Sequence, residues 1–163
     1  AKSAADHVAP SAIPEHVLLR KIGKGSYGEI WLARSALGAY RAVKLIYRAA
    51  LQDHAGAYER EFAGIERYEP LSRNHEGLVQ VLQFGRGTND AGEFFYYVME
   101  LLEGQTLRHR LQTGGLPVAD LLDLAIQMAD ALDAAHARGI VHLDTRGTGN
   151  VLMRPDGSPA PRA

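Results

Sequence analysis

The chain has 163 residues, of which 46% are hydrophobic and 23% are charged, a composition typical of soluble globular proteins with a packed core. Its net charge of −1 gives no basic field for nucleic acid, so we expect no nucleic-acid partner and only a local site for any phosphate. The absence of cysteine excludes disulfides, thiolate nucleophiles and cysteine-based zinc sites. No apolar run reaches the roughly 18 residues of a membrane helix, so we expect a cytoplasmic protein without a membrane segment.

The chain is expected to begin with a flexible leader that is followed by strands. Residues 1–16 are mostly small or polar and include prolines, which favours a loop. Alternation of apolar and polar residues predicts strands over 17–22, 29–33 and 40–46, with a turn at 35–39 between the second and the third. The sequence therefore predicts an antiparallel sheet at the start of the ordered chain.

A helix and two more strands follow. Apolar residues at helical spacing predict a helix over 55–68, and Pro70 is expected to end it. Apolar runs at 78–84 and 94–100 predict two strands, joined by a glycine-rich hairpin over 85–92. The apolar residues of the predicted helix are Tyr58, Phe62 and Ile65.

The remainder of the chain is predicted to be mainly helical. A helix is expected to start near Pro117 and to stop at Gly139 in a left-handed cap. One apolar stripe along this helix is expected to pack in a core. It consists of Leu121, Leu124, Ala125, Met128, Leu132 and Ala135. The predicted organisation is a leader over 1–16, a small α+β unit over 17–100, and a mainly helical unit over 101–163.

A glycine-rich hairpin lies between the first two predicted strands, and a lysine follows one strand later. Three glycines allow backbone N–H groups to approach a phosphate, and Lys44 adds a positive charge. The pattern Gly-x-Gly-x-x-Gly also opens dinucleotide-binding folds, but there the glycines lead into a helix, whereas here they lead into a strand. The segment reads Ile22-Gly23-Lys24-Gly25-Ser26-Tyr27-Gly28-Glu29-Ile30, with Ala42-Val43-Lys44 downstream.

A third motif, Ile140-Val141-His142-Leu143-Asp144 with Asn150 downstream, completes a pattern that resembles the protein kinase family. The amino-acid sequence of residues 59–62 and 69–79 is most similar to that of bacterial members of the eukaryotic-type serine/threonine class. The resemblance covers about residues 17–162. It implies an α+β, kinase-like fold with a small lobe, formed by a five-stranded antiparallel sheet and one helix, and an incomplete, mainly helical large lobe.

The resemblance implies that ATP binds under the glycine hairpin. Gly23, Gly25 and Gly28 would cover the phosphates, and Lys44 would hold the α- and β-phosphates while paired with a helix glutamate. Glu61 is the expected partner, because Arg60-Glu61-Phe62 resembles the family's version, and Glu59 and Glu66 are its rivals. The other residues expected to bind ATP are Lys24, Ser26, Tyr27, Glu29 and Leu152, with Ile22, Ile30, Ala42 and Met99 around the adenine and Glu100 and Leu102 at its edge.

The resemblance also implies the catalytic groups and the cofactors. Asp144 would accept the proton of the substrate hydroxyl or orient that hydroxyl, and Arg146 occupies the position of the family's lysine near the γ-phosphate. Asn150 would bind Mg²⁺. The implied reaction is transfer of the γ-phosphoryl group from Mg-ATP to a serine or threonine hydroxyl of a protein substrate.

Departures from the family pattern support a second hypothesis. Leu143 replaces the usual arginine, Asn150 stands six positions after Asp144 where the family has five, and the sequence is expected to be truncated before the Asp-Phe-Gly segment. These features favour a non-catalytic nucleotide-binding or interaction module, which is similar to a pseudokinase. A small-molecule phosphotransferase, which shares a loop of the His-x-Asp type, is a third alternative.

Overall fold

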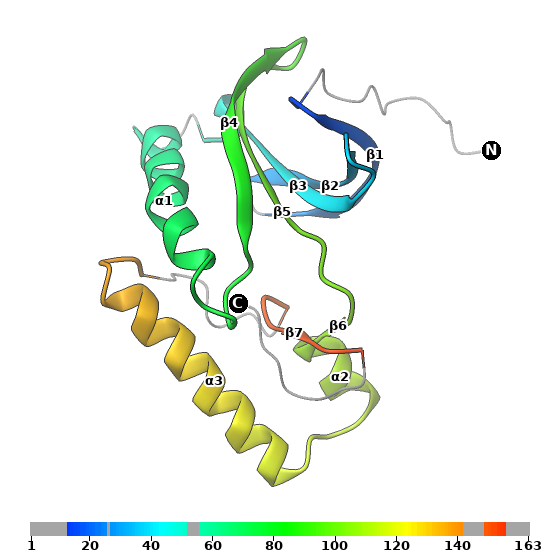
Figure 1. Cartoon of the computed structure of the whole chain (residues 1–163), viewed down its shortest axis with the longest axis vertical. Coiled ribbons are helices and arrows are strands. Elements are labelled where there is room, and N and C mark those ends of the chain that lie inside the picture. The colour runs from blue at the N-terminus through cyan, green and yellow to red at the C-terminus, as the bar shows by residue number, and fades with distance from the viewer. Residues whose placement is uncertain (1–12, 26, 52–55, 142–148, 156–163) are drawn as a thin grey trace, which may run out of the picture. The chain divides into compact units, whose positions relative to one another are not determined.

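The fold consists of two units, which we describe separately (Figure 1). The structure is a computed structural model that describes residues 13–25, 27–51, 56–141 and 149–155. The N-terminal unit comprises the chain up to Phe62 together with Gln83–Leu101. The C-terminal unit comprises Ala63–Leu82 together with the chain from Leu102 onward.

A five-stranded sheet forms the N-terminal unit, as predicted, and its strand order is β1-β2-β3-β5-β4. The first three strands pair in sequence order as antiparallel neighbours, and β5 then adds next to β3. A short 3-10 helix, η1 (Arg48–Leu51), follows β3. The strands are β1 (His16–Lys24), β2 (Gly28–Ser35), β3 (Tyr40–Tyr47), β4 (Val81–Asn89) and β5 (Gly92–Glu100).

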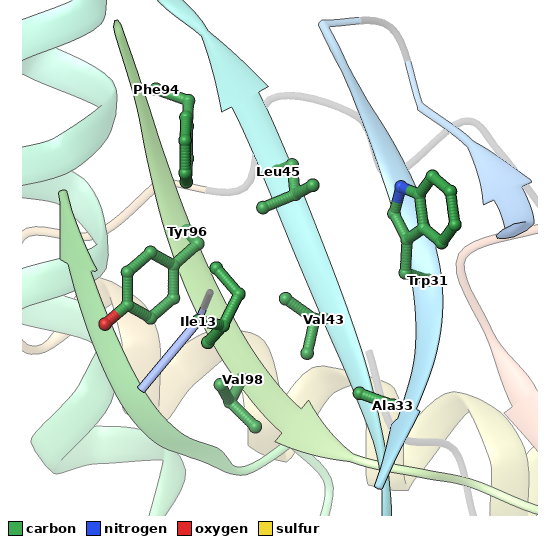
Figure 2. Packing of buried hydrophobic residues seen from close by; sticks show 8 residues of the cluster. All are labelled: Ile13, Trp31, Ala33, Val43, Leu45, Phe94, Tyr96 and Val98. Carbon is green, nitrogen blue, oxygen red and sulfur yellow. The ribbon is translucent and has the colours of Figure 1, made fainter. Parts of the chain in front are cut away.

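One face of this sheet carries the main core of the N-terminal unit, to which the segment before β1 contributes. Ile13 is only 3% exposed and lies among Val43, Tyr96 and Val98 (Figure 2). The backbone turns back here, because the His16 N–H donates to the Ile13 carbonyl over 3.0 Å. The predicted leader boundary is therefore too late, since packing begins at Ile13. The cluster comprises Ile13, Trp31, Ala33, Val43, Leu45, Phe94, Tyr96 and Val98.

The opposite face of the sheet receives the start of α1 (Ala57–Ser72). Phe95 of β5 meets the rings of Tyr58 and Phe62, with centroid separations of 5.1 and 5.6 Å. Both contacts are edge-on, an arrangement that aromatic pairs favour. These rings fix the first turns of α1 against the sheet.

The predicted end of this helix before Pro70 is wrong, because α1 continues through Pro70 to Ser72. Proline lacks an N–H group and therefore removes one helical hydrogen bond, a smaller loss in the last turn than in mid-helix. Ser72 compensates, since its hydroxyl donates to the Glu69 carbonyl (2.8 Å) and accepts from the Val81 N–H (3.0 Å). Leu71 beside it is buried. Tertiary packing thus overrides the helix-breaking signal.

The predicted hairpin over 85–92 is confirmed, but both strands extend into this segment and the turn is shorter than the segment. β4 runs to Asn89, and the turn is short: the Asn89 side chain accepts from the Ala91 N–H over 2.9 Å. The glycines that suggested a loop make room for rings on β5. A Cβ on Gly85 would lie 2.7 Å from the Tyr96 hydroxyl oxygen, and one on Gly87 would lie 2.6 Å from Phe94.

The C-terminal unit contains α2 (Leu107–Thr113) and α3 (Val118–His136), and a two-stranded sheet of β6 (Gln105–Thr106) and β7 (Leu152–Met153). Pro117 precedes α3, and Gly139 adopts a positive φ of 68° after it, which confirms both predicted ends. One buried cluster joins α3 to the end of α1 and comprises Leu71, Leu78, Ala131 and Ala135. A second joins α3 to α2 and β7 and comprises Leu107, Leu124, Val151 and Met153.

The apolar stripe predicted along α3 is only partly buried. Leu124 and Ala135 are buried, but Leu121 is 51% exposed and Ala125 is also exposed. The buried positions instead include Ala131, because the two clusters contact α3 along one narrow line. In the described part of the chain, no helix is long and apolar enough to span a membrane.

Candidate functional site

The glycine hairpin connects β1 to β2 and closes through its own backbone. Gly23 pairs with Ile30 across the two strands, and Lys24 pairs with Glu29. The Gly25 N–H donates to the Gly28 carbonyl over 2.9 Å. Ser26 lies outside the described residues, and Tyr27 beside it is 44% exposed. The predicted phosphate-binding segment therefore connects two antiparallel strands that stay paired as far as Lys24 and Glu29.

Lys44 lies in β3, and its side chain reaches the hairpin. It pairs with Ile30 of β2 on one side and with Tyr97 of β5 on the other. A Cβ on Gly25 would lie 3.4 Å from Lys44 Cε and 3.7 Å from its Nζ. Lys44 Nζ also lies 5.6 Å from the centroid of the Tyr97 ring, within the range of a cation–π contact. The structure thus brings the lysine and the glycine turn of the motif together within one unit.

Two glycines of the motif differ in what a side chain at their position would contact. A Cβ on Gly28 would lie 2.1 Å from the Leu45 carbonyl oxygen and 3.0 Å from Ile46 Cγ1, so the backbone of β3 excludes any side chain there. A Cβ on Gly25 would lie nearest the flexible end of Lys44, with the Gly28 carbonyl oxygen 3.9 Å away. Gly28 is therefore required by the sheet itself. At Gly25, by contrast, the sheet leaves space, and this space faces the Lys44 ammonium.

Glu29, one of the residues expected to bind ATP, holds β1 and β2 together. Its carboxylate forms an ion pair with Lys21 and accepts a hydrogen bond from the Trp31 indole N–H over 3.2 Å. Because residue direction alternates along a strand, Glu29 and Trp31 share the face opposite to Ile30 and Lys44. Its side chain therefore stabilises the base of the hairpin from the far side of the sheet.

The residues expected around the adenine divide between the units. Ala42 is buried and pairs with Met99, and strand alternation puts both on the face that carries Lys44. Ile30 shares this face, Ile22 is 39% exposed, and Glu100 ends β5. Leu102 and Leu152 belong to the C-terminal unit, where both line a cavity of about 550 Å³. Their roles in ATP binding stay predictions.

The structure does not show the expected ion pair between Lys44 and Glu61. Glu61 is exposed on α1, and among the described residues no carboxylate lies within ion-pair distance of Lys44. Glu59, its rival, is engaged elsewhere: it accepts hydrogen bonds from Arg48 (3.0 Å) and Arg86 (2.6 Å). The role of Glu61 therefore stays a prediction.

Two arginines anchor the start of α1. The Arg48 guanidinium lies 4.2 Å from the Tyr58 ring centroid, and that of Arg86 lies 4.1 Å from the Phe62 ring centroid. The hydrogen bond from Arg86 holds the pKa of Glu59 below its ordinary value, against the effect of burial and with further help from Arg48. Burial raises the pKa of Tyr58, so its ring stays neutral beside both guanidinium groups.

A family model described as the protein kinase domain matches residues 16–159. The chain belongs to the protein kinase family. The match includes both the glycine hairpin with Lys44 and the predicted catalytic loop, which agrees with the resemblance found in the sequence.

Serine/threonine-protein kinases are among the similar proteins. PknA of Mycobacterium tuberculosis is 36% identical over 148 residues, which cover 86% of this chain and 32% of PknA. PkaA of Streptomyces coelicolor is 33% identical over 156 residues, with 88% of this chain and 27% of PkaA covered. Pkn2 of Myxococcus xanthus is 33% identical over 132 residues, with 79% and 15% covered. The chain therefore spans about a third or less of the length of these relatives.

Of the predicted catalytic-loop residues, only Asn150 belongs to the described part of the chain. Asp144 and Arg146 fall within 142–148, outside the described residues. Asn150 is described and exposed, and β7 directly after it is anchored, since the Leu107 N–H donates to the Val151 carbonyl over 2.8 Å. The described residues contain no group of three acidic, histidine or cysteine side chains that could hold a metal ion. The roles of these loop residues stay predictions.

Sequence reasoning did not single out Tyr97. Its position in the apolar run over 94–100 marked it only as a strand residue. The signal that would have found it is the register of β3 against β5, which puts Tyr97 directly opposite Lys44.

Proposed function

We propose that this chain carries the ATP-binding part and the catalytic loop of a serine/threonine protein kinase. The reaction is transfer of the γ-phosphoryl group of ATP to a serine or threonine hydroxyl of a protein. The observation that carries the proposal is the approach of Lys44 to Gly25 in a hairpin that leads into a strand. This geometry suits a kinase rather than a dinucleotide-binding fold, in which the glycines open a helix.

In this proposal the N-terminal unit binds the nucleotide. The open backbone at Gly25 lets main-chain N–H groups approach phosphate oxygens, and Lys44 supplies the neutralising charge. Ile30, Ala42 and Met99 offer an apolar surface on the same face for the adenine ring. Glu61 pairs with Lys44 when the nucleotide is bound, which requires its side chain to turn from the solvent toward β3.

The catalytic loop performs the transfer. Asp144 orients the substrate hydroxyl and accepts its proton while the hydroxyl oxygen forms a bond to the γ-phosphorus and the bond from that phosphorus to the β–γ bridging oxygen breaks. Arg146 contributes positive charge beside the transferred group. The side-chain oxygen of Asn150 is a suitable ligand for Mg²⁺, which supplies charge neutralisation of the phosphates when it is bound. Because the reaction consumes ATP, we place it in the cytoplasm.

Nucleotide binding is tested first. The full chain is titrated with ATP, with and without Mg²⁺, while its thermal unfolding is followed, since a ligand that binds only the folded state raises the midpoint. We expect a rise in the midpoint that Lys44→Met reduces but does not abolish. The absence of any shift in the wild-type chain would contradict the proposal.

Phosphoryl transfer is tested second, with radiolabelled ATP and generic protein substrates. We expect incorporation of label that Asp144→Asn abolishes, because only that variant loses the proton acceptor. Incorporation that is unchanged in this variant would show that another protein or residue is responsible. ATP binding without any transfer would favour the non-catalytic nucleotide-binding module.

A further inference from the structure

Lys44 is held by an aromatic ring in this structure. Its Nζ lies 5.6 Å from the centroid of the Tyr97 ring, and the two residues are directly paired across β3 and β5. The described residues place no carboxylate within ion-pair distance of this ammonium. The ring face carries partial negative charge, so it attracts a cation without neutralising it.

The same side chain approaches the glycine turn. Lys44 Cε and Nζ lie within ordinary contact distance of the position that a Cβ on Gly25 would occupy. A lysine stem has four rotatable bonds, so an unrestrained ammonium would sample many positions. Contact with the ring of the neighbouring strand restricts Lys44 to positions near the hairpin.

The geometry points to Tyr97 as a positioning residue that holds the Lys44 ammonium beside Gly25, ready for the phosphates of the nucleotide. This inference rests on the proposed ATP-binding function. An ammonium that is already in place loses less conformational freedom when the nucleotide binds, and the affinity is correspondingly higher. Until Glu61 turns inward, the ring restrains Lys44 without neutralising its charge.

The ring, rather than the hydroxyl group, carries this role. Tyr97 is half-buried on the face of the sheet that holds Lys44, and its hydroxyl has no hydrogen-bond partner within the described ranges. Tyr97→Phe therefore preserves the interaction. Tyr97→Leu keeps an apolar side chain but removes the ring, so the two variants form a matched pair.

The acidic residues of α1 do not restrain Lys44 in this structure. The Glu59 carboxylate pairs with Arg48 of η1 and Arg86 of β4, and the Glu61 side chain is exposed. In this arrangement of the N-terminal unit, α1 supplies no acid to Lys44. Tyr97 is then the residue that restrains the lysine before Glu61 turns inward.

The effect on nucleotide affinity is measured by calorimetric titration of the full chain with Mg-ATP. We expect Tyr97→Leu to weaken binding about threefold to tenfold, the range typical of a partly desolvated cation–π contact. We expect Tyr97→Phe to stay within about twofold of the wild type. In a Lys44→Met background, Tyr97→Leu should cause no further loss, because the partner of the ring is gone. Emission from Trp31, buried in the sheet core, confirms that each variant is folded.

The contact itself is tested without nucleotide by NMR of the full chain labelled with ¹³C-lysine. The ε-methylene signal of Lys44, assigned by its absence in Lys44→Met, should be shifted upfield by the Tyr97 ring. The shift should persist in Tyr97→Phe and disappear in Tyr97→Leu.

The two measurements separate the possible failures. An ε-methylene signal at the position of unstructured lysine, or equal ATP affinity in the wild type and Tyr97→Leu, would overturn the positioning role. A chain that shows the ring shift but binds no ATP would overturn the proposed function and the positioning role with it, while the ring contact would stand.

Discussion

Gly28→Ala and Gly25→Ala separate the two reasons for which this hairpin contains glycine. At Gly28 the added methyl carbon would lie 2.1 Å from the Leu45 carbonyl oxygen, well inside contact distance, and its neighbour is backbone that belongs to a paired strand. The end of the β2–β3 ladder must therefore move. At Gly25 the methyl group would make only ordinary contacts, 3.4 Å from Lys44 Cε and 3.9 Å from the Gly28 carbonyl oxygen.

The expected magnitudes follow from these contacts. Overpacking against a well-ordered structure costs about 1–3 kcal/mol. In a domain of this size, each 1 kcal/mol lowers the thermal midpoint by about 2–4 °C, so Gly28→Ala should lower it by about 2–12 °C. Gly25→Ala should change stability by less than about 0.5 kcal/mol, as surface substitutions usually do. It should nevertheless weaken ATP binding, because a methyl group holds the phosphate away from the backbone.

Trp31 provides the assay for stability. It is the only tryptophan of the chain and is 4% exposed in the sheet core, so its emission reports unfolding of the N-terminal unit. ATP titration of both variants measures the change in their ATP affinity. If Gly28→Ala unfolds at the wild-type midpoint, or if both substitutions lower the midpoint equally, the assignment of Gly28 to the sheet and of Gly25 to the nucleotide is wrong.

Two further predictions concern the anchoring of the N-terminal unit. Because Arg86 and Arg48 lower the pKa of Glu59, its carboxylate stabilises the folded state above the ordinary value of 4.5, and this contribution is lost as the pH falls through the folded-state pKa. Glu59→Gln should therefore flatten the dependence of the midpoint on pH between about 6 and 3; an unchanged profile would show that the pair contributes nothing. Ile13→Ala should cost about 2–4 kcal/mol, measured by urea unfolding followed at Trp31, because it leaves a cavity in the core; a change below about 0.5 kcal/mol would place Ile13 outside this core.

The sequence predicted the elements whose signal is local. Alternation and short apolar runs located all five strands of the sheet, and the proline and glycine at the two ends of α3 gave its limits to within three residues. These features depend on residues that are close together in the sequence, so the sequence alone is enough to predict them. Membership of the kinase family was likewise carried by short motifs at fixed spacing, which the family match over 16–159 then confirmed.

The errors arose where a distant residue reverses a local signal. Pro70 should end a helix, but Ser72 links its last turn to Val81 and the helix continues. Gly85 and Gly87 suggested that the strand ends at residue 84, but rings from β5 occupy the space that their missing side chains leave, and β4 continues to Asn89. In each case the deciding partner lies on another element, so the local sequence contains only half of the interaction.

The candidate site shows the same limit of local sequence. The motif identified its charged residue, Lys44, but not the residue that contacts it. Lys44 was found because a lysine after a glycine hairpin is a recognisable pattern, and its predicted partner, Glu61, was implied by the resemblance to the kinase family. The register places an aromatic ring opposite it, and Glu59 of α1 pairs with two arginines. Strand order and register are therefore the missing information: once β5 is known to lie beside β3, Tyr97 is fixed as the neighbour of Lys44. A test of the proposed phosphate binding by this hairpin must then include the ring as well as the charge.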